Sequence, residues 1–119
     1  MNSIGVHRFE RPDETRRFPN GHIDLVSTST GMVGWSVFEP GWRWSNDVKP
    51  IAQTDTCQTP HVGYVVSGTL HIEMADGESA EIGPGAIASI PPGHDAWVVG
   101  DEPAVMVDWA GATNYAKSS

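Results

Sequence analysis

Short runs of β-branched and aromatic residues, separated by glycine and proline, make up most of this chain. The clearest pattern is apolar residues at Leu70, Ile72 and Met74 with His71 and Glu73 between them. A period of two is typical of a strand with one buried face, so His71 and Glu73 are predicted to face solvent. The length and spacing of the runs predict a β-sandwich or barrel. The predicted strands cover residues 23–27, 34–38, 61–67, 69–75, 79–82, 86–90, 96–99 and 104–109.

The segments between these runs carry turn signals and little helical signal. An Asp-Gly pair between residues 75 and 78 predicts a hairpin. At most one helical turn is predicted, at residues 12–15. A loose tail is predicted at residues 114–119. Glycine and proline are spread through the chain and form no linker. We therefore predict one all-β domain over residues 1–119, with its core at about 34–110, N-terminal strands and an arm in 1–33, and a tail in 111–119.

Charge and cysteine content exclude several classes of function. The net charge is −8, from seven basic and fifteen acidic residues, which argues against a nucleic-acid partner. No apolar stretch has the length of a membrane span, and the N-terminus has no signal-peptide pattern. These features predict a cytoplasmic protein without a membrane partner. Cys57 is the single cysteine, so an internal disulfide is excluded.

Two segments together resemble the paired motifs of the cupin superfamily. Gly85, five residues and then Pro91-Pro92-Gly93 match the second motif, and the run from His61 to Gly68 has the strand-then-glycine ending of the first. The resemblance covers roughly residues 40–109. It implies a double-stranded β-helix, or jelly-roll barrel, with a ligand site in its mouth.

The metal-ligand positions of the first motif depart from the usual cupin pattern. Cupins usually supply two histidines and a glutamate from this motif. Counted back from Gly68, the glutamate position holds His61, and the two histidine positions hold Cys57 and Asp55. The resemblance therefore implies a candidate metal site in which these three residues replace the usual ligands.

The second motif departs from the pattern as well. Its usual histidine position holds Ala96, and His94 stands two residues earlier. Residues two apart on a strand face the same side, so His94 is predicted to reach the interior at a different depth. Asp95 is predicted to accept a hydrogen bond from a ligand histidine. The ligand set would be Asp55, Cys57, His61 and His94, which together suit zinc, copper, iron or manganese.

A metal-free pocket is the alternative interpretation of the same residues. Cys57 would then be a small buried apolar side chain, and His61 and His94 would bond to each other or to backbone groups. Asp55 would cap a loop through its own backbone.

Tryptophans flank the candidate site. Trp42 and Trp44 precede the first motif and Trp97 follows His94, so these three are candidates for substrate binding. The alternative is that they fill the core of a small domain. Tyr64 has the opposite strand parity to His61 and is predicted to lie outside the cavity.

Three functions remain open from the sequence. The leading one is a small-molecule enzyme that uses a divalent metal held in the barrel, of the dioxygenase, isomerase or lyase class. The second is a cupin that binds or senses a small molecule without chemistry, and the third is a thiol-dependent activity at Cys57. The open sheet edges of a small jelly roll also predict a homodimer, with residues 4–9 as a pairing strand.

Overall fold

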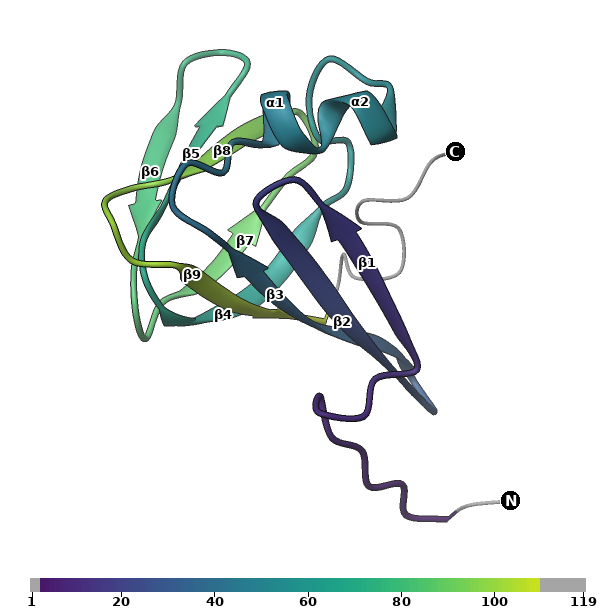
Figure 1. Ribbon diagram of the computed structural model, residues 1–119. Helices are drawn as coiled ribbons and strands as arrows, with labels where there is room; N and C mark the ends of the chain where they lie inside the picture. The colour runs from purple at the N-terminus through teal and green to yellow at the C-terminus, as the bar shows by residue number, and fades with distance from the viewer. Residues whose placement is uncertain (1–2, 110–119) are drawn as a thin grey trace.

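The structure, a computed structural model, describes residues 3–109 of the chain. These residues form two antiparallel β-sheets that face each other, with two short helices at one end (Figure 1). The larger sheet has the strand order β1-β2-β3-β9-β4-β7, and the smaller has the order β6-β5-β8. The strands are β1 (Glu14–Phe18), β2 (Gly21–Thr28), β3 (Gly31–Phe38), β4 (His61–Ser67), β5 (Leu70–Met74), β6 (Ser79–Ile82), β7 (Ile87–Ile90), β8 (His94–Val98) and β9 (Ala104–Asp108), and the helices are α1 (Trp44–Asp47) and α2 (Lys49–Ala52).

The all-β prediction is confirmed, and each of the eight predicted strands is present within a few residues of its expected ends. The predicted alternation between more buried and less buried side chains is present along β8 and β5. His94, Ala96 and Val98 are buried along β8, and Glu73 on β5 is exposed. The turn between Met74 and Ser79 joins β5 and β6 as the predicted hairpin.

The N-terminal region differs from the prediction. The helical turn expected at residues 12–15 is wrong, because Glu14 begins strand β1, which pairs along its length with β2. β1 is an edge strand, and edge strands carry charged side chains that hide a strand pattern. Arg16 and Arg17 lie in its centre.

The arm at residues 4–9 forms no strand in the single chain. Its aromatic residue Phe9 packs on Trp35 with ring centroids 5.4 Å apart. Ile4 and Val6 are exposed. Pairing of this arm between two copies stays a prediction, and the tail expected at residues 114–119 lies outside the described residues.

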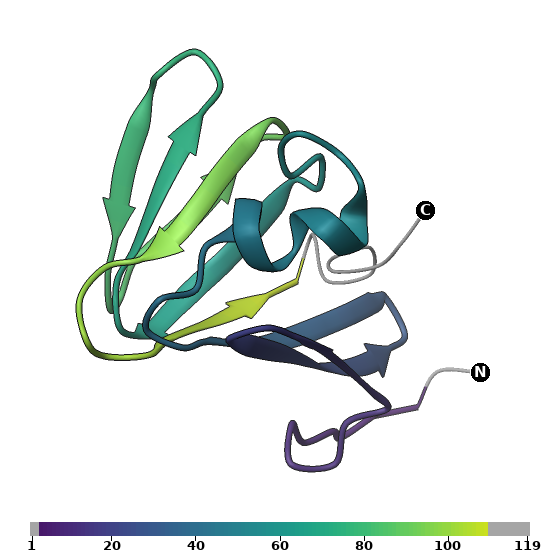
Figure 2. The same cartoon turned by 45° about the horizontal axis from the view of Figure 1, so that its top comes forward.

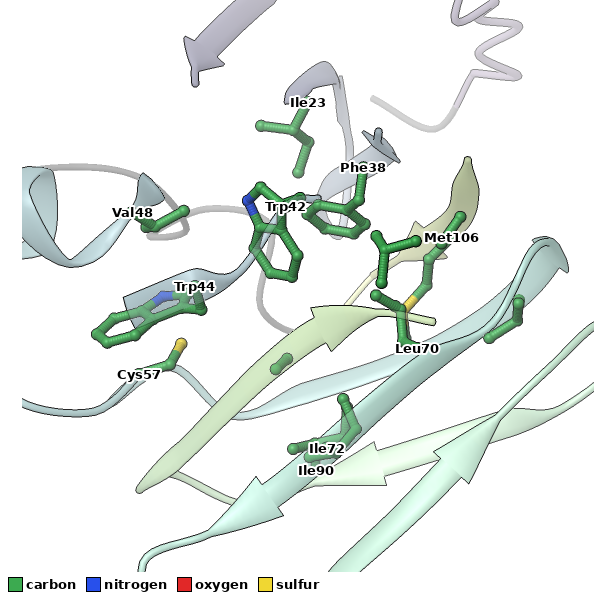
Figure 3. Packing of buried hydrophobic residues seen from close by; sticks show 14 of the residues in the cluster. Ile23, Phe38, Trp42, Trp44, Val48, Cys57, Leu70, Ile72, Ile90 and Met106 are labelled. Atoms are coloured by element: carbon green, nitrogen blue, oxygen red, sulfur yellow. The ribbon is translucent and has the colours of Figure 1, made fainter. Parts of the chain in front are cut away.

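The space between the sheets is filled by one apolar core. Val65, Ile23, Leu25, Trp44 and Val48 are its largest fully buried side chains. The residue Trp44 comes from α1, so the helical segment closes one end of the space between the sheets (Figures 2 and 3). Within residues 3–109, neither helix has the length or apolar character needed to cross a membrane.

Candidate functional site

Three chemically active side chains meet where β4 and β8 begin, one strand in each sheet. His61 is the first residue of β4 and His94 the first of β8. Cys57 lies in the loop before β4 and pairs with His94 through the backbone. Its N–H donates to the carbonyl of His94 at 2.8 Å, and its own carbonyl accepts from the N–H of Gly93 at 2.7 Å. The backbone itself therefore brings the three residues together.

All three side chains are buried and close to one another. Within residues 3–109, the ligand atoms of Cys57, His61 and His94 lie within 4.8 Å of one another. The Sγ of Cys57 lies 3.6 Å from Nε2 of His61. The two imidazole rings meet edge to face, with centroids 5.2 Å apart.

In both His61 and His94, the Nδ1 ring nitrogen contacts an oxygen atom of a residue outside the cluster. The Nδ1 of His61 lies 2.5 Å from Oδ2 of Asp108, which is buried on β9. The Nδ1 of His94 lies 2.7 Å from the carbonyl oxygen of Pro91. An acceptor at Nδ1 keeps a proton on that nitrogen, so the neutral form of each ring carries its lone pair on Nε2.

The groups around Cys57 and His61 favour a negatively charged thiolate on Cys57 and a positively charged imidazolium on His61. Burial raises the pKa of Cys57, but hydrogen bonds and charge from His61 and His94 outweigh burial and lower the pKa from 9.0 to about 6. Burial lowers the pKa of His61, but Asp108 and Cys57 outweigh it and raise the pKa from 6.5 to about 9. A thiolate beside an imidazolium is the favoured state near neutral pH.

The cluster opens onto a small cavity between the sheets, which we call the inner cavity. Its volume is about 40 Å³, and since a water needs roughly 10–15 Å³ measured in this way, it has room for about three waters. His61, His94, Asp108 and Ser36 form its polar side. The remaining wall is apolar and consists of Phe38, Trp42, Trp44, Leu70, Ile72, Ile90, Ala96 and Met106.

Three of the residues predicted for the site lie elsewhere. Asp55 is fully exposed, with its carboxylate 3.7 Å from Nζ of Lys49. Within residues 3–109, the carboxylate of Asp95 forms no hydrogen bond with the ring of His94. It instead accepts from the backbone N–H groups of Ser45 and Ala96 and pairs with Arg43. A carboxylate one residue after an inward-facing histidine points to the opposite face of the strand.

The third is Trp97, which lies on the outer face of β8. Its ring stacks on His71 at 4.4 Å, and the guanidinium of Arg43 lies 4.2 Å from its centroid. Trp42 and Trp44 do line the inner cavity. In Figure 3 the indole nitrogen of Trp42 lies on the side of Ile23 and Val48, away from Leu70. Among the described residues no acceptor reaches that nitrogen, so Trp42 offers the cavity an apolar ring face.

Comparison with known proteins agrees with this architecture. Residues 54–110, which include all three cluster residues, match the family described as "Cupin domain". The chain folds as a small cupin domain. Among curated proteins, no sequence matches it.

Solved structures share the fold at low sequence identity. A cupin-like protein from Thermotoga maritima is 19% identical with a TM-score of 0.55, over 78% of this chain and 70% of that one. KdgF from Halomonas sp. is 19% identical with a TM-score of 0.53, over 76% of each chain. A protein of unknown function from Rhizobium leguminosarum is 19% identical with a TM-score of 0.59, over 91% of this chain and 98% of that one. At these identities the likeness shows the fold alone.

The candidate site contains one residue that sequence reasoning missed, Asp108, through its carboxylate. Gly63 pairs with Asp108 across β4 and β9, which places Asp108 diagonally opposite His61. A signal for it was present in the sequence, since Asp108 has the same strand parity as Ala104 and Met106. A carboxylate at an inward position of an apolar strand indicates a buried charge, which needs a partner.

Proposed function

We propose that this cupin domain is a metal-dependent enzyme for a small molecule, with zinc bound by Cys57, His61 and His94. The supporting observation is the position of the two Nδ1 atoms. Asp108 and the carbonyl of Pro91 bind them, while the Sγ of Cys57 lies 3.6 Å from Nε2 of His61 and the ligand atoms of all three residues lie within 4.8 Å of one another. Metal-binding histidines are oriented in this way in proteins, by a carboxylate or carbonyl behind the ring.

The spacing of the donor atoms supports the same assignment. Zinc–sulfur bonds of about 2.3 Å and zinc–nitrogen bonds of about 2.0–2.1 Å place the two donors roughly 3.6 Å apart around a tetrahedral centre. Cys57 Sγ and His61 Nε2 are 3.6 Å apart. The three ligand atoms lie within 4.8 Å of one another, so His94 would complete the set after a shift of about 1.5 Å or less.

The donor set also narrows the chemistry. With Asp55 on the surface, one thiolate and two imidazoles remain, a set that zinc and copper prefer over manganese. A zinc ion held by Cys57, His61 and His94 would supply Lewis-acid chemistry. We therefore favour isomerase or lyase chemistry on a small molecule with an oxygen-containing functional group. Because the volume of the inner cavity is only about 40 Å³, only the reactive end of this molecule fits inside it.

Metal content tests the proposal directly. Protein purified without chelator is expected to contain close to one zinc per chain by elemental mass spectrometry, and Cys57→Ser and His61→Ala are expected to lose most of it. Asp55→Asn and His71→Ala serve as matched controls, because both residues lie outside the cluster. Equal zinc content in all four variants, or wild-type protein that zinc cannot load, would overturn the proposal. Iron in place of zinc would redirect it to dioxygenase chemistry.

A second prediction concerns the carboxylate behind His61. Asp108→Asn keeps the shape of the side chain and removes its charge, so the affinity for zinc is expected to fall about 10- to 100-fold. Competition with a chromophoric chelator measures the change. Asp95→Asn is the control, since Asp95 contacts Ser45, Ala96 and Arg43 and is expected to change affinity little. A similar loss in both variants would show that Asp108 does not act through His61.

A thiol-dependent activity is the second candidate, and one observation favours it. Cys57 Sγ, His61 Nε2 and Nδ1, and Asp108 Oδ2 form a continuous chain of contacts at 3.6 and 2.5 Å. Nucleophile, base and orienting carboxylate stand in this order in thiol and serine catalysis. Zinc separates the two candidates, because a bound metal would protect Cys57 from alkylation by iodoacetamide. Loss of an activity on zinc addition would favour the thiol.

A further inference from the structure

The two sheets differ in the side chains that they turn away from the core. The smaller sheet has a polar outward side, which carries His71 and Glu73 on β5, Glu81 on β6 and Asp95 on β8. A polar outward side is typical of an antiparallel sheet that packs on a core with its other side. The larger sheet departs from this rule on β3, β9, β4 and β7, where the outward positions are almost all apolar. We call this surface of the four strands the outer face.

A row of four apolar side chains crosses the outer face. Trp35 on β3 pairs with Val107 on β9, Val107 pairs with Tyr64 on β4, and Tyr64 pairs with Ile87 on β7. Tyr64 is 41% exposed and Ile87 is 71% exposed. Valines flank the row at positions 33, 37, 62, 66 and 105, and within residues 3–109 no outward position of these four strands is charged. Aromatic enrichment and charge depletion are typical of the core of a protein interface.

An apolar arm starts at the same face. Phe9 packs on Trp35 with ring centroids 5.4 Å apart, so residues 3–10 leave the domain from its outer face. Farther along this arm, Ile4 is 94% exposed and Val6 is 85% exposed. Figure 1 shows the arm, in purple, running away from both sheets. One side of the molecule therefore exposes both an apolar face and an apolar arm that does not cover it.

We propose that a second copy of this chain covers the outer face, in a two-fold symmetric dimer in which the arm of each copy crosses the outer face of the other. A two-fold axis uses the same surface of both copies, so one chain supplies the arm and the face that the interface needs. This inference is independent of the metal site.

The dimensions favour a second copy with its arm. Strands about 4.8 Å apart with a rise of about 3.4 Å per residue give a four-stranded face of roughly 300 Å² in projection. A stable interface buries about 800 Å² per partner, so two outer faces alone make a small contact. The arm adds to it, because residues 3–10 are all exposed except Phe9. Eight extended residues span up to about 26 Å, which is enough to cross four strands.

Charge favours the same occupant. Residues 8–17 contain four arginines and three acidic residues, a net charge of +1, so the rest of the chain carries −9 of the total of −8. The basic segment next to the arm of one copy is therefore attracted by the acidic body of the other. Two acidic bodies also repel each other wherever their charged surfaces meet, and the uncharged outer face lets them approach without placing like charges together.

The test is the mass of the protein in solution. Sedimentation equilibrium of the wild type is expected to give twice the 12.8 kDa mass of one chain. Tyr64→Glu and Ile87→Glu each place a charge in the row, and each is expected to raise the dissociation constant of the dimer about 100-fold or more. Val99→Glu is the matched control, because Val99 is an exposed apolar residue that follows β8 in the smaller sheet, and it is expected to keep the wild-type constant.

A double variant tests the arm. Ile4→Asp combined with Val6→Asp leaves the sheets intact and is expected to weaken the dimer about 10- to 100-fold, because two apolar side chains are no longer buried on the partner. A dissociation constant equal to that of the wild type would overturn the crossing of the arm.

Other outcomes overturn the dimer itself. A wild type that stays monomeric at about 100 μM, where even a weak dimer forms, would do so. If that monomer dimerises once residues 110–119 are removed, the chain's own tail is the occupant of the outer face. A dimer that neither Tyr64→Glu nor Ile87→Glu weakens would place the interface elsewhere. Circular dichroism checks that each variant is folded, and Ile87→Glu keeps the test decisive if Tyr64→Glu is not, because Ile87 is 71% exposed on an edge strand.

Discussion

Gly68→Ala is expected to destabilise the protein by about 3–5 kcal/mol, the largest loss we predict for a single methyl group. Gly68 has φ = 73°, where an L side chain is strained. A Cβ there would also overlap the carbonyl oxygen of Pro103 and come within 2.5 Å of Cα of Ala104. Both contacts are to backbone, so no side chain can move aside. A melting temperature lower by more than about 10 °C is the expected result.

The chain offers a matched control for this effect. Gly100 has φ = 88°, but a Cβ there meets nothing within 4 Å. Gly100→Ala therefore isolates the conformational cost, about 1–2 kcal/mol, and chemical denaturation of both variants separates it from steric overlap. Equal losses would show that the approach of residues 103–104 to Gly68 is unimportant.

The second large effect is the ionisation of Cys57 in metal-free protein. Its pKa is lowered from 9.0 to about 6, so the thiolate is expected to form as the pH rises through about 6. The pKa of His61 is raised to about 9, so the imidazolium persists until the pH passes that value. Between these limits both groups are charged and stabilise each other. The ultraviolet absorbance of the thiolate, followed against pH, measures the midpoint.

The control is a variant that removes the negative charge of Asp108, which contacts His61. Asp108→Asn removes the negative charge that favours the imidazolium of His61, so the pKa of His61 falls and that of Cys57 rises toward its ordinary value. Denatured wild-type protein is expected to titrate near 9, as an unperturbed thiol does. A wild-type midpoint near 9 in the folded state would contradict the ion pair.

The regular parts of the fold were predictable because their patterns are local. Alternation from Leu70 to Met74 fixed a strand and its buried face, and the motif from Gly85 to Gly93 located the second half of the barrel. β1 was not predicted because Arg16 and Arg17 are charged residues of an edge strand, and charged side chains there hide the alternation that marks a strand.

The site was predictable only where a strand or a backbone pair holds it. His61 and His94 begin strands, and Cys57 is bonded to the backbone of His94. Asp55 was assigned by counting back along a loop, which has no fixed direction for its side chains. Asp108 comes from a strand distant in sequence, and its contact with His61 depends on the pairing of β9 with β4. Strand order is a long-range property that spacing along the chain does not contain.

The backbone pairing between Cys57 and His94 separates two properties of this domain. Its hydrogen bonds involve only main-chain N–H and carbonyl groups, so they do not depend on which side chain stands at position 57. The frame of the site can therefore persist while the donor atom changes. With the proposed metal bound, exchange of sulfur for nitrogen or oxygen at this one position would change which element the cluster prefers without rebuilding the barrel, so metal preference could evolve independently of fold stability.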